Sequence, residues 1–376
     1  MKKDLVVFYH ANCNDGTGGA LAFADLIEKD YNLMEGKTDS PINGRFGDKP
    51  TAYFVPVHYS YNFHPELYRN RTVVFIDFTP SYAALKEIYN HLGEDEYLII
   101  LDHHTTAVNN IKRFVEEQKD ISKLRIYFRQ DQSGAKIAHT LGCFQSLIDN
   151  EIAFKDDGNI MTNIDVILKV PGETVDEMFF DFLDVRDRWI SDHPLISKSD
   201  ADALAMYLFN NDFANSSLKE ARHLYHRITN DDVDLLYRFV EYGHTILSYV
   251  QRQAKDLVDR NGAKSVAQDV DGKTIELCVV SSSGGLSDAA SYWNTLCQPK
   301  PSIFVGVVFD LGKEVTQLSI RSKSGAKARL LAEALVNEGI ALNGGGHDEA
   351  AGARLLGVRG DIVELITNFI KSNKMF

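Results

Sequence analysis

A chain of 376 residues exceeds what one compact core usually holds, so two domains are expected. The composition is that of a soluble globular protein, with 44% hydrophobic and 25% charged residues. No apolar run approaches the roughly 18 residues that a membrane span requires. The formal net charge of −13 disfavours binding along a long nucleic-acid duplex, because such binding relies on a basic face that neutralises phosphates.

The four cysteines are scattered and form no CxxC pair; they are Cys13, Cys143, Cys278 and Cys297. This spacing argues against a disulfide framework and against a structural zinc site, and it is typical of the reducing cytoplasm. The N-terminal lysines and the short apolar run after them superficially resemble a secretion signal, but Asp4 interrupts the pattern. We therefore interpret the run as a first β-strand and expect a cytoplasmic protein.

Short, uniformly apolar runs alternate with helix-like spacing in the first hundred residues. The runs predict parallel strands buried on both faces, at Leu5–Tyr9, Val73–Asp77 and Leu98–Asp102. Helices are predicted over Ala20–Glu28 and Ser81–Leu92. The alternation predicts an α/β fold with a doubly wound, mostly parallel sheet. The polar, glycine-containing segment Asp30–Lys49 predicts a surface insertion or long loop.

Long helical spacing from about Asp200 to Val258 predicts a helical connector. A smaller α/β domain follows it, with a glycine cluster after its last predicted helix. The predicted strands of this domain are Thr274–Ser281, Ser302–Asp310 and Val315–Ser322, and its predicted helices are Asp288–Leu296 and Ala328–Asn337. We expect a catalytic domain over 1–200, the connector over 201–260 and a substrate-binding domain over 261–376.

Histidines and aspartates stand where the first three predicted strands end. His10 follows the first strand, with Asp15 five residues later; Asp77 ends the second, and the third ends in Asp102, His103 and His104. Since ligands of open α/β sheets bind beyond the carboxyl ends of the strands, these groups should converge. Aspartate oxygens with histidine nitrogens suit Mn²⁺, and two such ions can activate a water for attack on phosphorus.

Each of these residues also has a structural interpretation. An aspartate at a strand end often caps the next helix, and for Asp77 alone this role weighs as much as a functional one. A single histidine such as His10 is more often a satisfied core group. The adjacent pair His103–His104 is harder to explain in this way, because burying two imidazoles beside a carboxylate without partners is costly.

Two other patterns favour structural roles. The glycines of Gly16–Ala20 match no dinucleotide or P-loop signature, and we interpret them as allowing a helix to begin close to the strand. Cys13 lacks an orienting acid that would make it a nucleophile, and is interpreted as a small semi-buried residue. Phe179, Phe180 and Trp189 could stack on bases, but their apolar spacing favours the core.

Five motifs together resemble the DHH phosphoesterase superfamily, which includes RecJ-type exonucleases, nanoRNases and cyclic-dinucleotide phosphodiesterases. YHANCNDGTGGALA is similar to the first motif, FIDFTP to the second, LDHHTT to the third and DVRDRW to the fourth. NGGGHDEAAGARL is similar to the GGGH signature of the accessory DHHA1 domain. The LDHH and GGGH pieces are highly specific when they occur together in this order.

The resemblance implies roles for particular residues. His10 and Asp15 would be metal ligands, Asp77 would bridge two ions, and His103 would bind the second ion. Asp102 and His104 would orient the site and touch substrate or water. Asp187 would be the ligand of the fourth motif, with Asp184 as the alternative. In the accessory domain the resemblance implies phosphate binding by Arg321, Gly344, Gly345, Gly346 and His347.

One departure from the family pattern concerns the first motif. Many members have two aspartates there, whereas this chain has Asn12, Asn14 and the single Asp15. An asparagine can ligate through its carbonyl oxygen but brings no charge, so a weaker first metal site could follow.

The function implied is a metal-dependent phosphodiesterase that cleaves short oligonucleotides or dinucleotides to nucleoside 5′-monophosphates by a metal-activated hydroxide. The cofactor would be two Mn²⁺ ions, with Mg²⁺ or Co²⁺ as substitutes. The partners expected are short single-stranded RNA or DNA or a dinucleotide, with no membrane, and a homodimer is left open. The alternatives are a cyclic-dinucleotide phosphodiesterase and, from another class, a catalytically impaired nucleotide-binding protein.

Overall fold

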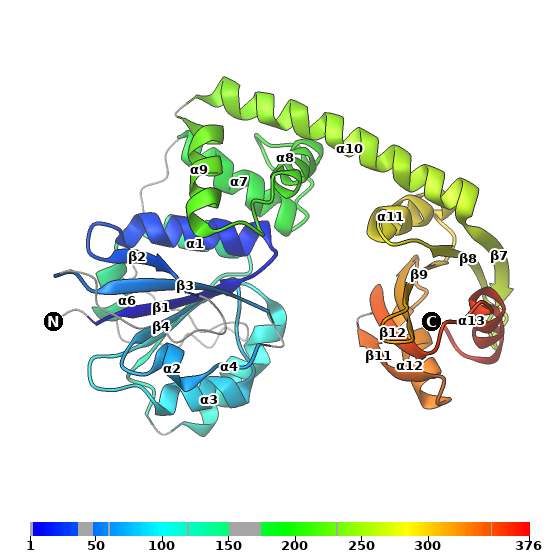
Figure 1. The fold of residues 1–376 in the computed structure, drawn as a ribbon, viewed down its shortest axis with the longest axis horizontal. Coiled ribbons are helices and arrows are strands. Elements are labelled where there is room, and N and C mark those ends of the chain that lie inside the picture. The colour runs from blue at the N-terminus through cyan, green and yellow to red at the C-terminus, as the bar shows by residue number, and fades with distance from the viewer. Residues whose placement is uncertain are drawn as a thin grey trace. The chain divides into compact units, whose positions relative to one another are not determined.

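The computed structural model describes residues 3–36, 48–58, 61–118, 120–149, 174–230, 232–346 and 348–376. The chain forms two compact units, Met1–Ile246 and Leu247–Phe376, each of which has its own sheet (Figure 1). Within the described part of the chain, no helix is long and apolar enough to cross a membrane.

The first unit is built on a six-stranded sheet in which every pair of neighbours is parallel. In spatial order the strands are β2 (Asn32–Glu35), β3 (Thr51–Val57), β1 (Leu5–His10), β4 (Thr72–Ile76), β5 (Leu98–Asp102) and β6 (Leu124–Phe128). The residues of β4, β5 and β6 are all buried, and apart from Thr72, Asp102 and Arg125 they are apolar, as strands covered on both faces require.

Helices cover both faces of this sheet, so the predicted doubly wound α/β architecture is confirmed (Figure 1). Alternate residues of β1 point to opposite faces: Leu5 and Val7 belong to one core, and Val6 and Phe8 to the other. The first core is completed by α1 (Asn14–Ile27), α5 (Gly134–Thr140), α6 (Phe144–Asp149), α7 (Val175–Asp187), α8 (Lys198–Asn210) and α9 (Leu218–Thr229). The second is completed by α2 (Pro65–Tyr68), α3 (Tyr82–Asn90) and α4 (Thr105–Glu117).

The order of the strands reverses beside β1. From β1 the chain crosses to the edge strand β2, returns to β3 beside β1, and then continues outward with β4, β5 and β6 on the other side. At such a switch point the loops after neighbouring strands diverge and leave room for a ligand. The polar residues that follow β1 and β4 lie at this point.

The long helix α10 (Val233–Asn261) begins in the first unit and ends in the second. Leu236 and Val240 in its first half belong to the first core. Gly243 allows α10 to approach α8 closely, because a Cβ atom there would come within 1.9 Å of the carbonyl oxygen of Ala203. Val258, near its end, packs in the second unit.

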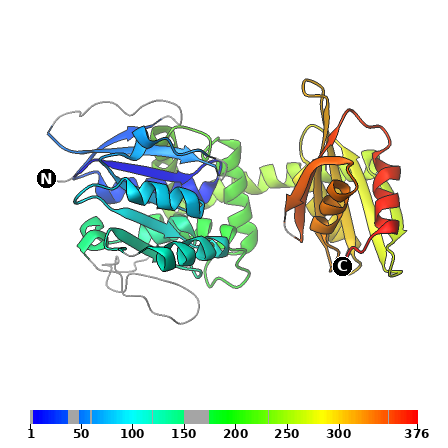
Figure 2. The ribbon, with the colours of Figure 1, turned by 90° about the horizontal axis from the view of Figure 1, so that it is seen from below.

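The second unit is a mixed six-stranded sheet with helices on both faces. Its strands, in spatial order, are β11 (Ala341–Gly346), β12 (Ala350–Leu356), β10 (Val315–Lys323), β9 (Ser302–Asp310), β8 (Thr274–Ser281) and β7 (Ala263–Gln268), and only β8 and β9 run parallel. One core contains α12 (Ala328–Asn337) and α13 (Ile362–Ser372), both seen beside the sheet in Figure 2, and the other contains α11 (Leu286–Cys297).

The predicted strands and helices of both domains are present, with boundaries that differ by a few residues at most, except that α1 begins six residues earlier than predicted. The prediction of a loop over Asp30–Lys49 is wrong in part, because Asn32–Glu35 form the edge strand β2; residues 37–47 lie outside the described residues. The glycines Gly344–Gly346 form the end of a strand, β11. Glycine has little β propensity, so the pairing of β11 with β12 stabilises the extended backbone here.

Candidate metal centre

The first functional side chains follow β1. His10 is the last residue of β1, and α1 begins four residues later at Asn14. This abrupt start depends on Gly16, because a Cβ atom at that position would lie 2.2 Å from the carbonyl oxygen of His10. Asp15 is buried in the first turn of α1 and accepts hydrogen bonds from the amides of Gly134 (2.7 Å) and Ala135 (3.0 Å), at the start of α5. The N-terminus of α5 therefore fixes the Asp15 carboxylate.

Asp77 occupies the centre of the site. It follows β4 with a φ of 54°, a left-handed conformation that is uncommon for residues with a Cβ atom. One carboxylate oxygen, Oδ2, lies 3.5 Å from Nδ1 of His10, and the other, Oδ1, lies 3.2 Å from Nε2 of His103 and 3.7 Å from Nδ1 of His104. The turn after β4 thus directs one carboxylate toward all three histidines.

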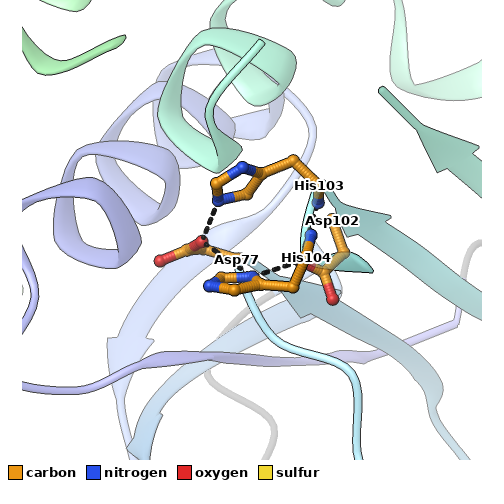
Figure 3. Close-up of side chains that lie close together, drawn as sticks. All are labelled: Asp77, Asp102, His103 and His104. Atoms are coloured by element: carbon orange, nitrogen blue, oxygen red, sulfur yellow. Dashed lines mark hydrogen bonds and ion pairs between the residues drawn. The ribbon is translucent and has the colours of Figure 1, made fainter. Parts of the chain in front are cut away.

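Asp102 holds the two histidines that follow β5 (Figure 3). Its Oδ1 atom accepts hydrogen bonds from the backbone amides of His103 (2.7 Å) and His104 (3.2 Å), and it lies 2.8 Å from Nδ1 of the His104 ring. Its Oδ2 atom accepts a hydrogen bond from the hydroxyl of Thr79. Asp102 is fully buried. These contacts favour a role for Asp102 in orienting the two histidines over one in touching substrate or water.

Three carboxylates surround one nitrogen of His103. Its Nε2 atom lies 3.2 Å from Asp77, 3.3 Å from Asp187 and 3.8 Å from Asp15. A neutral imidazole nitrogen can donate only one hydrogen bond, so this arrangement concentrates more negative charge than the ring can balance. The donor set, three carboxylates and an imidazole, fits a divalent cation such as Mn²⁺.

Asp184 and Asp187, the two candidates of the fourth motif, have different surroundings. Asp184 binds the Arg188 guanidinium through both oxygens (2.8 and 2.7 Å) and accepts the backbone amide of Ser133. Asp187 instead lies with Asp15 and His103. This geometry favours Asp187 as the ligand and gives Asp184 a structural role.

The electrostatics follow from burial and from the clustered charges. Burial raises the pKa of Asp15 well above its ordinary value, and the charges of Asp77 and Asp187 raise it further. Burial likewise raises the pKa of Asp187, and Asp77 adds to the effect. Burial would also raise the pKa of Asp77, but hydrogen bonds from His10 and His103 outweigh it and hold the pKa far below its usual range.

The two histidines after β5 are shifted toward their charged forms. Burial alone would lower the pKa of His103, but the hydrogen bond to Asp77 and the neighbouring carboxylates raise it. Burial would lower the pKa of His104 too, whereas the hydrogen bond to Asp102 and its charge raise that pKa to about 9. These imidazoles therefore balance part of the carboxylate charge.

Cys13 is a candidate ligand that the sequence interpretation did not include. Potential ligand atoms of His10, Cys13 and Asp77 lie within 4.8 Å of one another, and those of Asp15, His103 and Asp187 form a second such group. Both first-motif residues expected to bind metal thus lie among potential ligands, His10 in the group with Cys13 and Asp15 in the group with His103. The spacing Cys13-x-Asp15, which puts two potential ligands two residues apart, was the available signal.

The asparagines of the first motif have distinct positions. Asn14 donates a hydrogen bond of 3.4 Å from its side-chain amide to the carbonyl of Ala205 in α8, so it ties two helices together. Asn12 is exposed and has a φ of 56°, a left-handed conformation that asparagine tolerates better than most residues.

The remaining predicted site residues belong to the second unit. Arg321 in β10 pairs with Ala350, and Gly346 in β11 pairs with Ala351, so the two strands bring Arg321 and the glycines to the same end of the sheet. The guanidinium of Arg321 donates to the carbonyl of Ile320 (3.0 Å). Gly346 has a φ of 144°, and a Cβ atom there would lie 2.5 Å from the carbonyl oxygen of Ala350. His347 lies outside the described residues.

Comparisons with known proteins bear on the fold. A scan against models of protein families and a search of curated proteins found no match. Among solved structures, the DHH domain of a protein described as a member of a family of ribosomal proteins has a TM-score of 0.53 and 12% identity, over 99% of this chain and 88% of that one. At this identity the likeness establishes the fold alone. The chain has the fold of a DHH-domain protein, and the resemblance seen in its motifs is confirmed at that level.

Two further structures give lower scores. The pGpG-specific phosphodiesterase PggH from Vibrio cholerae has a TM-score of 0.47 and 14% identity, over 98% of this chain and 99% of that one. RecJ from Thermus thermophilus, in complex with Mn²⁺, has a TM-score of 0.44 and 15% identity, over 98% of this chain and 51% of that one. Both scores lie below 0.5, so the conclusion about the fold depends on the first structure.

Proposed function

We propose that this protein is a metal-dependent phosphoesterase that hydrolyses phosphodiester bonds in short oligonucleotides or dinucleotides and releases nucleoside 5′-monophosphates. The observation that carries the proposal is the position of His103 Nε2, within 3.8 Å of three carboxylates. A protein has little reason to gather so much negative charge at a switch point of an α/β sheet unless a cation balances it.

Two groups of side chains would hold two ions. One group comprises His10 and Asp77, with Cys13 beside them, and the other comprises Asp15, His103 and Asp187. Asp77 is suited to bridge, because its Oδ2 faces His10 while its Oδ1 faces His103. Mn²⁺ is the proposed cofactor, with Mg²⁺ or Co²⁺ as substitutes. Ions held by these residues would lower the pKa of a bound water and stabilise negative charge on phosphoryl oxygens.

The residues of the chain itself orient the site and supply a proton. Asp102 holds Nδ1 of His104, which fixes the ring, and the His104 side chain is 31% exposed. Burial lowers the pKa of His104, but in the ion-free site the hydrogen bond to Asp102 and its charge raise it, and the Nε2 atom of the fixed ring is the one that would donate a proton to a substrate oxygen.

The substrate preference follows from charge and size. A net charge of −13 opposes extensive contact with a long polyanion, whereas a short substrate needs only a local anion site. The backbone of Gly344–Gly346, with Arg321 at the same end of that sheet, would form such a site for a phosphate. A cyclic dinucleotide is the alternative substrate.

Turnover assays test the proposal. Purified protein would be incubated with Mn²⁺ and labelled dinucleotides, short RNA or cyclic dinucleotides, beside the variant Asp77→Ala and the exposed control Asp48→Ala. Release of 5′-monophosphates that Asp77→Ala abolishes and Asp48→Ala preserves supports the proposal. Tight binding without turnover under any metal would instead identify an impaired, nucleotide-binding protein, and would refute the proposed activity.

A further inference from the structure

Trp189 is a large aromatic residue that the protein leaves in solvent. It is 65% exposed, whereas Phe179 and Phe180, which share its helical region, are 0% and 1% exposed. The prediction of a core position is confirmed for the two phenylalanines and is wrong for Trp189. The physical reason is that α7 ends at Asp187, so the apolar spacing of the helix no longer determines where residue 189 points.

The backbone of Trp189 is in a conformation that bulky residues avoid. Its φ is 56°, in the left-handed region, where a side chain with a Cβ atom is strained. Glycine or asparagine would satisfy this turn at lower cost. Strain of this kind persists only where the surrounding structure maintains it, and it is concentrated at functional sites.

Two cations hold the indole ring in place. The guanidinium carbon of Arg186 lies 4.8 Å from the ring centroid, and Nζ of Lys198 lies 4.5 Å from it. Both cations also bind Asp202, Arg186 through Oδ1 (3.0 Å) and Lys198 through Oδ2 (3.2 Å). The ring is nonetheless 65% exposed, so part of its surface stays open to solvent beside the two cations.

Trp189 also lies next to the candidate metal centre in the chain. Asp187, whose carboxylate lies 3.3 Å from His103 Nε2, precedes it by two residues. Two Cα–Cα steps span at most about 7.6 Å, so the backbone of Trp189 is within about the length of one nucleotide of that ligand.

We propose that the exposed face of Trp189 is a stacking platform for a nucleobase of the substrate, one nucleotide away from the phosphate that is cleaved. The inference rests on the proposed phosphodiesterase function and adds a base-binding site to it. Stacking on an aromatic face tolerates any base, because every base has a π surface. The site therefore selects substrates that carry a base at this position, without selecting which base.

A structural role for the ring makes a different prediction. If Trp189 only shielded the ion pairs of Arg186, Lys198 and Asp202, its removal would lower the stability of the fold and affect all substrates alike. A stacking platform affects only substrates that carry the base. A dinucleotide and its abasic analogue, which retains the ribose and phosphates, distinguish the two roles.

The kinetic test compares Trp189→Ala, Trp189→Phe and the control Tyr242→Ala, which removes another exposed aromatic ring of the same unit. For a dinucleotide, Trp189→Ala should raise KM by about 5-fold to about 150-fold, with little change in kcat. Trp189→Phe should restore most of the loss, and Tyr242→Ala should resemble the wild type. Equal effects of Trp189→Ala on the dinucleotide and its abasic analogue, or no effect on KM, would overturn the proposal.

Fluorescence separates this inference from the proposed catalytic function. The chain has two tryptophans, and the other, Trp293, is only 4% exposed, so solvent-exposed emission reports Trp189. Adding a dinucleotide to Asp77→Ala, which should not turn over, is expected to quench this emission, and the abasic analogue is not. Quenching without wild-type turnover would sustain the stacking site while the catalytic proposal fails; turnover without quenching would refute the stacking site alone.

Discussion

Gly134 offers a way to disturb the candidate metal centre without changing a ligand. A Cβ atom at this position would lie 2.5 Å from Cβ and 2.9 Å from Cα of Asp77, and 3.0 Å from Oδ2 of Asp15. Ordinary contacts begin at 3.4 Å, so Gly134→Ala requires a displacement of about 0.9 Å (3.4 − 2.5) between the start of α5 and Asp77. The two closest atoms belong to the backbone and the Cβ of Asp77 and cannot rotate away, and the Asp15 carboxylate is held by the amides of Gly134 and Ala135, so the shift must move the two carboxylates.

Metal sites tolerate far less movement, since ligand distances are held to within about 0.2 Å. We expect Gly134→Ala to weaken Mn²⁺ binding by about 10-fold to 100-fold, equivalent to about 1.4–2.7 kcal/mol, which is the range seen when groups that orient ligands are removed. The added methyl group should also lower the free energy of unfolding by about 1–3 kcal/mol.

Isothermal titration calorimetry with Mn²⁺ measures the affinity, and urea unfolding in EDTA measures the stability. Gly284→Ala is the matched control, because nothing lies within 4 Å of a Cβ atom at that glycine. A Gly134→Ala protein that is folded and binds Mn²⁺ with wild-type affinity would refute the view that Asp15 and Asp77 are positioned for an ion.

Four further predictions concern single groups. Asp187→Ala should abolish tight Mn²⁺ binding with little loss of stability. Asp184→Ala removes the acceptor of Arg188 and of the Ser133 amide, so it should lower the free energy of unfolding in urea by about 1–3 kcal/mol and leave the metal ligands intact. The opposite pattern would make Asp184 the metal ligand and Asp187 the structural residue. Cys13→Ser should weaken Cd²⁺ binding more than Mn²⁺ binding in competition titrations, because a thiolate prefers softer ions; equal losses would exclude Cys13 as a ligand. Burial and neighbouring charges raise the pKa values of Asp15 and Asp187, so Mn²⁺ must displace protons when it binds. Calorimetry should therefore show an Mn²⁺ affinity that rises with pH, and an affinity independent of pH would contradict this. In EDTA, the contribution of His104 to the free energy of unfolding should be complete below about pH 6.5 and should be lost as the pH rises through about 9, the pKa of His104 in the folded protein. Urea unfolding at a series of pH values measures this decline, and Asp102→Asn should make it less steep. An unchanged dependence on pH would show that Asp102 does not set the pKa of His104.

Much of the first unit could be predicted because its signals are local. The uniformly apolar runs of β1, β4 and β5 indicate strands covered on both faces, and strand ends in parallel sheets share one edge. The convergence of His10 and His103 on Asp77 follows from that rule.

Other features depend on contacts between distant parts of the chain. Asp15 is fixed by amides of Gly134 and Ala135, about 120 residues away, and no local pattern announces that pairing. Asp184 and Asp187 are three residues apart and share a helix face, so spacing alone could not separate them. The strand β11 has three glycines and little β propensity, and it exists because β12 pairs with it.

The central claim is that side chains from separate strands and helices hold a pair of divalent ions around Asp77. Crystals soaked in Mn²⁺ and measured at the manganese absorption edge test it most directly. We predict two anomalous peaks about 3.5–4 Å apart, one near His10 and one near His103, with a carboxylate oxygen of Asp77 bound to each. A saturating soak that leaves no peak within bonding distance of Asp77, with the histidines bonded only to protein groups, would contradict the claim.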